Sequence, residues 1–130
     1  MQNAVLILDG HSLSYKDVVN VASNQMKVSI SEEAMERLKA GRKLVEQWSS
    51  MDKPVYGLNR GVGQNKDRTI NKEMYARFNR NVILSHSIGV GPELPKEIVR
   101  AVMVTRLNTI LVGCTGVQPE IAKMLVTFLN

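Results

Sequence analysis

The stretch "SEEAMERLKAGRKLVEQWSSM", residues 31–51, predicts an amphipathic helix in the first half of the chain. Its apolar stripe consists of Ala34, Leu38, Val45 and Trp48, together with the small residue Gly41. Residues spaced three and four apart lie on one side of a helix, so this side is expected to be buried. Either Ser29, which has capping-box spacing to Glu32, or Ser31, which precedes two glutamates, caps the N-terminus. Pro54 disfavours continuation of the helix into the following loop.

Two short strands and one short helix are predicted before this stretch. The segment "AVLILDG", residues 4–10, is typical of a short buried strand. The segment "MKVSI", residues 26–30, alternates in the manner of a strand with one buried face. Between them, "LSYKDVVNVAS", residues 13–23, predicts a helix with Ser12 or Ser14 as its N-cap.

Three further helices are predicted after it. The first begins near Asn71 and carries an apolar stripe that ends at His86. The second begins at Pro95 and ends near Gly113, and its few polar positions predict burial on most sides. The last begins at Pro119, and its final apolar run predicts that these helices pack against a partner beyond the 130 residues. The predicted fold class is therefore mainly α with short N-terminal strands.

Length and composition are those of a globular protein. With 130 residues, 44% hydrophobic and 22% charged, a single domain is expected, and no apolar run approaches the roughly 18 residues of a membrane span. The N-terminus lacks the basic segment and the cleavage site of a secretory signal, so we expect a cytoplasmic protein that does not associate with membranes. The single Cys114 has no Cys or His partners at metal-ligand spacing. It is expected to be a small buried side chain, and no metal site is predicted.

The positive net charge of +5 is concentrated in one segment, residues 60–80. Its cations are Arg60, Lys66, Arg68, Lys72, Arg77 and Arg80, against the anions Asp67 and Glu73. The segment lacks the interleaved aromatic residues of single-strand binders, so no nucleic-acid partner is predicted. One hypothesis is therefore a small, non-catalytic helical binding module that uses this basic face on an acidic partner.

The loop "KPVYGLNRGVGQNKD", residues 53–67, follows neither helical nor strand periodicity. Gly61 and Gly63 allow positive φ and let a backbone amide approach a ligand such as a carboxylate. Their spacing matches neither a dinucleotide fingerprint nor a phosphate loop, and an ordinary tight turn is the alternative. Tyr56 acts as a general base only if amide dipoles or positive charge, for example from Arg60, stabilise its phenolate. Otherwise its ring packs and its hydroxyl reaches water.

Four motifs, in their order along the chain, are more specific than any motif alone. They are Tyr-Gly-x-Asn-x-Gly-x-Gly at 56–63, Leu-Ser-His before Gly-Val-Gly at 84–91, Arg-x-Asn at 106–108, and Gly-x-x-Gly-Val-x-Pro-Glu at 113–120. With the sequence around them, they resemble the N-terminal part of the aromatic amino acid ammonia-lyases, the family of histidine, tyrosine and phenylalanine ammonia-lyases and related aminomutases. Taken singly, His86 is either a hydrogen-bonded core histidine or a ligand contact.

The resemblance implies a fold, a reaction and three site residues. The fold is the N-terminal domain of the fumarase/aspartase-like lyases. These enzymes convert an aromatic amino acid to an aryl-acrylate and ammonia with a methylidene-imidazolone (MIO) prosthetic group, which forms from an internal Ala-Ser-Gly. Tyr56 matches the catalytic tyrosine that takes a proton from the β-carbon, and Gly63 matches a glycine that lines the substrate site. His86 matches the residue that meets the substrate ring, which favours a histidine- or tyrosine-type enzyme.

Two departures from the family pattern bear on these expectations. Arg60 and Val62 stand where the family usually has threonine and phenylalanine, so the amino acid substrate stays open. No Ala-Ser-Gly occurs in the 130 residues, so MIO cannot form from this chain. We therefore expect residues 1–130 to be the N-terminal portion of a longer, homotetrameric ammonia-lyase, inactive without the remaining chain and the other subunits. An aminomutase of the same family is the alternative.

Overall fold

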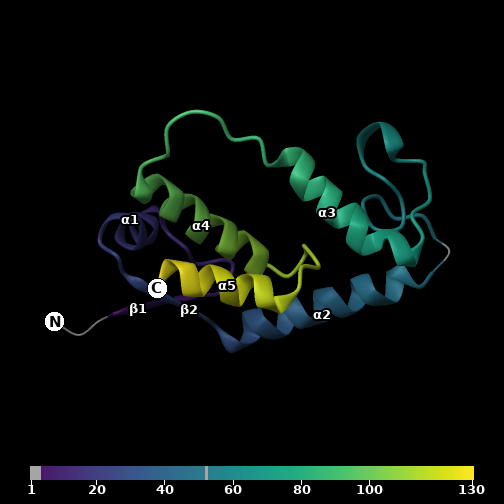
Figure 1. Ribbon diagram of the computed structural model, residues 1–130. Helices are drawn as coiled ribbons and strands as arrows, with labels where there is room; N and C mark the ends of the chain where they lie inside the picture. Colours follow the sequence, from purple (N-terminus) through teal and green to yellow (C-terminus); the bar gives the residue numbers. More distant parts are fainter. Residues whose placement is uncertain (1–3, 52) are drawn as a thin grey trace. The chain divides into compact units, whose positions relative to one another are not determined.

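Five α-helices and two short β-strands form the regular structure of the described residues, 4–51 and 53–130, in a computed structural model of the chain (Figure 1). In chain order they are β1 (Val5–Leu8), α1 (Tyr15–Ser23), β2 (Lys27–Ile30), α2 (Glu32–Ser49), α3 (Tyr75–His86), α4 (Lys96–Leu111) and α5 (Pro119–Leu129). Two short 3-10 helices, η1 (Gly63–Asn65) and η2 (Lys72–Met74), lie between α2 and α3 in the sequence. The predicted class, mainly α with short N-terminal strands, is confirmed.

The chain divides into two compact units. The first contains the described residues up to Leu44 together with Glu93–Asn130, and the second is Val45–Pro92. The first unit holds both strands, α1, most of α2, α4 and α5, whereas the second holds the end of α2, the loop with Tyr56, and α3. The boundary after Leu44 falls inside a helix, so no change of composition marks it in the sequence.

The two strands form a parallel pair in the first unit. Val5 lies opposite Lys27 and Leu8 opposite Ile30, and α1 makes the crossover that a parallel pair requires. The side-chain amide of Asn130 also pairs with β2. Its Oδ1 accepts from the Val28 N–H at 2.8 Å, and its Nδ2 donates to the Val28 carbonyl at 2.9 Å. An amide side chain thus supplies at Val28 the two hydrogen bonds that a further strand would make.

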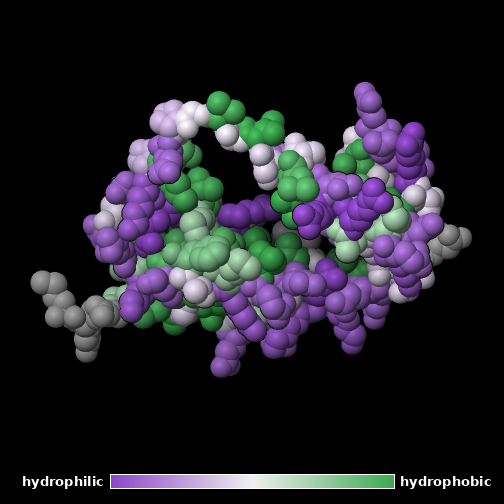
Figure 2. Space-filling view, in the orientation of Figure 1, coloured by the Kyte–Doolittle hydropathy of each residue, from purple (hydrophilic) through white to green (hydrophobic). Residues whose placement is uncertain are grey.

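The hydrophobic core of the first unit is built from β1, β2 and all its helices. Its buried residues are Leu8, Val21, Val28, Ala34, Leu38, Val104, Leu107, Ile110, Leu111, Ala122 and Leu129. The prediction that α4 is buried on most sides is wrong for this chain, because Val102 is 61% exposed and Ile98 and Val99 are also exposed. Burial follows from the number of packed neighbours, and α4 packs mainly against α1 and α5. Figure 2 shows further apolar surface on the segment between α3 and α4, where Ile88 and Val90 are exposed.

Arg100 is a charged residue inside this unit, 9% exposed. Its Nε and one terminal nitrogen donate to the Val21 carbonyl at 3.0 and 2.7 Å, and its other terminal nitrogen donates to the Leu129 carbonyl at 2.8 Å. Both carbonyls lie in the last turns of helices, α1 and α5, where the helix dipole places partial negative charge. The guanidinium therefore ties two helix ends together from a position on α4.

Side-chain caps fix how the chain enters α1. Ser14 is the N-cap, and its hydroxyl and the Asp17 carboxylate form a reciprocal capping box, which decides between the two predicted serines. In the preceding turn the Asp9 carboxylate accepts from the backbone N–H groups of His11 and Ser12, both at 2.8 Å. These bonds favour the ionised carboxylate and lower the pKa of Asp9 to about 2. At the start of α2, the Ser31 hydroxyl accepts from the Ala34 N–H.

The Asp9 turn gives a pH prediction. Because its pKa is lower in the folded chain than in the unfolded chain, Asp9 contributes stability that is fully present above about pH 4 and is lost as the pH falls towards about 2. Melting temperatures of the chain and of Asp9→Asn, measured from pH 5 down to pH 2, check this. The acid-induced fall should be smaller in the variant, and equal falls in both proteins would contradict the role of Asp9.

Candidate active-site loop

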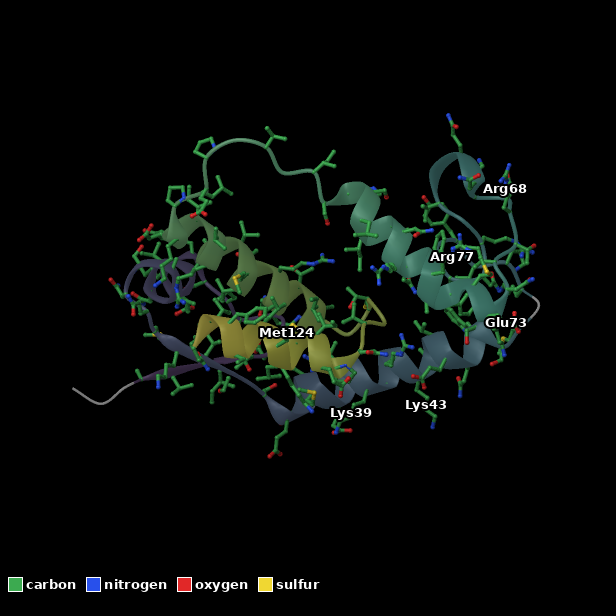
Figure 3. The ribbon with its side chains drawn as sticks, in the orientation of Figure 1. Lys39, Lys43, Arg68, Glu73, Arg77 and Met124 are labelled. Atoms are coloured by element: carbon green, nitrogen blue, oxygen red, sulfur yellow. The ribbon has the colours of Figure 1, made fainter. Side chains whose placement is uncertain are left out.

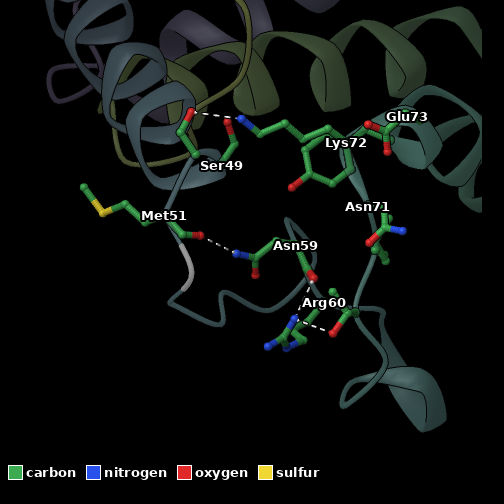
Figure 4. A pocket seen from close by; sticks show the side chains of 11 residues that line it. Ser49, Met51, Asn59, Arg60, Asn71, Lys72 and Glu73 are labelled. Carbon is green, nitrogen blue, oxygen red and sulfur yellow. Dashed lines mark hydrogen bonds between the residues drawn. The ribbon is translucent and has the colours of Figure 1, made fainter.

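Asn59 organises the loop that carries Tyr56 in the second unit. It is 7% exposed, and its Oδ1 accepts from the Val55 N–H at 2.7 Å. Its Nδ2 donates to the carbonyls of Lys53 at 2.9 Å and Met51 at 3.4 Å, the second of which is drawn in Figure 4. Every polar atom of this buried side chain is thus engaged with backbone.

The loop brings two of the predicted site residues together. The backbone N–H of Gly63 donates to the phenol oxygen of Tyr56 at 3.1 Å. Gly63 has φ +57, and a Cβ at this position would meet no atom within 4 Å, so backbone conformation and not space favours glycine. Tyr56 is 65% exposed, which leaves its oxygen open to further partners. A hydrogen bond donated to this oxygen stabilises negative charge on it, so the arrangement suits a phenolate base.

Gly61 serves the loop in a different way from the one predicted. It is buried and its φ is not positive, but a Cβ would lie 2.2 Å from the Asn65 carbonyl oxygen. Its N–H donates to the Arg68 carbonyl at 3.0 Å, and the Ile70 N–H donates to the Asn59 carbonyl at 3.0 Å. Glycine is therefore required here by the close approach of two stretches of backbone, which closes the loop on itself.

Arg60 is held by the loop and contributes to a polar cavity. One of its terminal nitrogens donates to Thr69 Oγ1 at 2.8 Å and to the Asn59 carbonyl at 3.3 Å (Figure 4). It lines a cavity of about 430 Å³ with Lys72, Glu73, Ser49 at the end of α2 and the following Ser50, and Tyr56 is not among the lining residues. The Tyr56 oxygen is thus hydrogen-bonded to a backbone amide. The described hydrogen bonds of Arg60 go to Thr69 and Asn59, so none of them supports the predicted role of its charge in stabilising the phenolate.

His86 is the last residue of α3 and is exposed, so it is not a core histidine in this chain. Its Nδ1 lies 2.7 Å from the Val82 carbonyl oxygen and 3.1 Å from Ser85 Oγ. Because Val82 O can only accept, Nδ1 donates to it, and in the tautomer of the neutral imidazole that this bond selects Nε2 is the acceptor. Nε2 has no hydrogen-bond partner in the described part of the chain. Likewise no hydrogen bond in that part joins His86 to Tyr56 or Gly63.

The remaining predicted features fall outside this loop or form no site. Arg68 and Arg77, labelled in Figure 3, are exposed, as are Lys66 and Arg80. Cys114 is exposed in the turn between α4 and α5, so its predicted burial is wrong. Over residues 4–51 and 53–130 we find no cluster of three or more potential metal ligands and no helix long and apolar enough to span a membrane.

Comparison with known proteins places this loop in an enzyme family. The model of the aromatic amino acid lyase family matches residues 13–130. Histidine ammonia-lyase from Treponema denticola is 42% identical over 121 residues, which are 93% of this chain and 24% of that protein. Histidine ammonia-lyase from Bacillus subtilis is 40% identical over 126 residues, 97% of this chain and 25% of that protein. The chain therefore belongs to the aromatic amino acid lyase family and spans about a quarter of the length of these relatives.

Solved structures agree with this assignment. An ergothioneine-degrading enzyme, ergothionase from Treponema denticola in complex with desmethyl-ergothioneine sulfonic acid, matches 98% of this chain and 26% of its own, with a TM-score of 0.94 and 46% identity. Tyrosine aminomutase from Streptomyces globisporus matches 98% of this chain and 24% of its own, with a TM-score of 0.92 and 29% identity. The fold is thus shared with part of the lyases and aminomutases of this family.

Proposed function

We propose that this chain is the N-terminal portion of an ammonia-lyase and supplies its proton-abstracting base. The observation that carries the proposal is the hydrogen bond from the Gly63 N–H to the Tyr56 phenol oxygen, within the family's Tyr-Gly-x-Asn-x-Gly-x-Gly motif. The reaction is the elimination of ammonia from an amino acid of histidine or tyrosine type, which leaves an aryl-acrylate. The remaining chain and the other subunits of a cytoplasmic homotetramer complete the site, and the 130 residues are inactive without them.

In this proposal Tyr56 takes the proton that is lost from the β-carbon of the substrate. That C–H bond is only weakly acidic, so the base must be held close to it and must be able to carry negative charge before the transfer. The Gly63 amide serves the second requirement, because a hydrogen bond donated to the phenol oxygen stabilises negative charge that develops there. The exposure of Tyr56 leaves its side chain accessible to a substrate, so that the β-carbon can approach the phenol oxygen.

The residues present do not fit the MIO group that the family implies. The nearest sequence to Ala-Ser-Gly is Ala22-Ser23-Asn24, which lacks the glycine and ends α1 with Ala22 buried. We propose that the parent chain forms the group from residues outside these 130, where it would turn the amino group into a leaving group. The steps proposed for Tyr56 and His86 concern only the β-hydrogen and the ring of the substrate.

His86 supports a substrate whose ring donates a hydrogen bond. With Nδ1 engaged by Val82, its Nε2 accepts, and both an imidazole N–H and a phenol O–H are suitable donors. A phenyl ring has no donor, so a phenylalanine substrate would leave Nε2 unpaired once the site closes. This supports histidine or tyrosine over phenylalanine, and it applies equally to an aminomutase of the same family.

A prediction for selectivity follows in the full-length parent. His86→Leu should shift relative kcat/KM towards phenylalanine by roughly one to two powers of ten, because an unpaired buried polar group costs about 1–3 kcal/mol. The measurement is kcat/KM for histidine, tyrosine and phenylalanine in parent and variant. Arg80→Leu is the matched control, since Arg80 lies on the same helix as His86 and is exposed, and it should leave the ratio unchanged. An unchanged ratio in His86→Leu would remove the ring contact from the proposal.

Ergothioneine is a second candidate substrate, because the ergothioneine-degrading enzyme is 46% identical over 98% of this chain. Ergothioneine is the trimethylammonium betaine of a thio-histidine, and its ring offers N–H donors to His86 Nε2. Its amine leaves as neutral trimethylamine, which needs less activation than an amino group does. The same tyrosine base would serve both eliminations.

The amine that is released tests the proposal and separates the candidates. The full-length parent is incubated with histidine, with tyrosine and with ergothioneine, and the amine and the acrylate are quantified. We expect an aryl-acrylate with ammonia from an amino acid, or with trimethylamine from ergothioneine. A β-amino acid without net release of ammonia would indicate the aminomutase. Absence of any turnover would overturn the proposed function.

A further inference from the structure

Asn59 lies at the point where three parts of the Tyr56 loop meet. Its side chain bonds Lys53 at the entry to the loop and Val55 at the start of the turn, and its carbonyl accepts from Ile70 at the exit. It is buried, although the loop around it is mostly exposed. A polar side chain that is buried in an exposed loop and fully bonded to backbone specifies one arrangement of that backbone.

Tyr56 lies inside the turn that Asn59 closes. The Val55 N–H donates to Asn59 Oδ1, and the Asn59 N–H donates back to the Val55 carbonyl at 3.3 Å, so the two ends of the turn are joined in both directions. The residue next to Val55 is Tyr56, and the direction of its side chain follows from the backbone of this turn. The phenol then meets the Gly63 N–H, which is seven residues further along the chain.

We propose that Asn59 is a positioning residue that holds the Tyr56 phenol against the Gly63 amide. It acts through the Val55 N–H, and its side chain makes no hydrogen bond to the phenol or to the Gly63 amide in the described structure. The position of the base therefore depends on a side chain three residues after it in the motif. The consequence for catalysis rests on the proposed function, whereas the consequence for the loop does not.

Amide exchange in the 130-residue chain tests the loop directly. In Asn59→Ala, the amides of Val55 and Gly63 should both exchange about fivefold faster or more, as expected when an ordinary hydrogen bond is lost. In Tyr56→Phe only the Gly63 amide should be affected, because the Asn59 bond to Val55 is retained. Thr69→Val is the matched control, since it removes a side-chain bond to Arg60 elsewhere in the loop and should change neither amide.

The outcome that overturns the proposal is specific. If Asn59→Ala speeds exchange of the Val55 amide but leaves that of Gly63 as in the unmodified chain, Asn59 only stabilises the backbone around Val55 and does not position Tyr56. If Thr69→Val also speeds exchange of the Gly63 amide, the loop responds to the loss of any side-chain hydrogen bond, and Asn59 has no specific positioning role. Both exchange measurements use the 130-residue chain and need no catalytic activity. Their results therefore hold whether or not the parent is a lyase.

Kinetics of the full-length parent supply the second readout. Asn59→Leu should lower kcat by about 10²-fold with little change in KM, because a displacement of the base by about 1 Å costs that much while substrate contacts persist. Asn59→Asp keeps an acceptor for the Val55 N–H and should recover part of the loss. Equal changes of kcat and KM in both variants would indicate a merely structural residue and would overturn the positioning role.

Discussion

Replacing Tyr56 with phenylalanine is expected to lower kcat of the full-length parent by about 10²–10⁴-fold, the range contributed by a positioned general base. Phenylalanine keeps the ring and removes only the oxygen that accepts from the Gly63 N–H. Substrate binding does not use this oxygen in our account, so KM should change little. Steady-state rates of aryl-acrylate formation in parent and variant are the measurement.

Tyr15→Phe is the matched control for this experiment. Tyr15 begins α1 in the first unit and is exposed, and it lies outside the motif that carries Tyr56. Its loss of a phenol oxygen should leave kcat unchanged. A Tyr56→Phe enzyme that retains more than about a tenth of the parental kcat would show that another group takes the β-proton.

Replacing Arg100 with methionine is expected to lower the free energy of unfolding of the chain by about 2–5 kcal/mol. Methionine fills much of the space of the arginine stem but cannot donate to the carbonyls of Val21 and Leu129. Both carbonyls belong to buried residues, and each buried group left without a partner costs about 1–3 kcal/mol. A loss of this size is a large part of the stability of an ordinary domain.

Urea denaturation of the 130-residue chain measures this loss. Arg106→Met is the matched control, because Arg106 lies on the same helix but is exposed, and its replacement should change stability by less than about 0.5 kcal/mol. Similar shifts of the urea midpoint in both variants would show that the buried bonds of Arg100 are not what stabilises the junction of α1, α4 and α5.

Local signals in the sequence predicted the serine caps of α1 and α2, whereas α3 begins at Tyr75 and the predicted cap Asn71 makes no side-chain cap hydrogen bond. The hydroxyls of Ser14 and Ser31 accept from the backbone N–H three residues later, at the starts of α1 and α2. These caps were predictable because the two partners are close in the sequence. Long-range hydrogen bonds could not be predicted, because their partners are far apart in the sequence. The Gly10 N–H donates to the Asn108 side chain, which explains part of the Arg-x-Asn motif, yet the two residues are 98 positions apart.

The burial of individual side chains was predicted less well, because the hydrophobicity of a helix does not determine how many other elements pack against it. The apolar composition of α4 predicted burial on most sides, whereas only the face with residues such as Val104 and Leu107 is buried in this chain. Cys114 was expected inside by residue type and is exposed, since the turn that carries it lies at the surface.

For the site, the family motif identified residues but not how the loop holds them. Tyr56 and Gly63 were predicted from the motif, and the structure joins them by a hydrogen bond. Asn59 was missed, because asparagine in a glycine-rich loop is usually a turn residue. Its place inside the motif, between the tyrosine and the glycines, was the signal that could have identified it. The exposure of His86 was also not predicted, since its helical stripe suggested a buried face.

In the proposed function, this chain provides the base that removes a β-hydrogen from an aromatic amino acid substrate. Histidine that carries deuterium at both β-hydrogens, or the correspondingly labelled tyrosine or ergothioneine, is converted by the full-length parent, and the acrylate is analysed by mass spectrometry. We predict an aryl-acrylate that has lost one of the two deuterium atoms, formed much more slowly by Tyr56→Phe. A deaminated product that keeps both deuterium atoms, or an acrylate formed equally fast without Tyr56, would contradict the account.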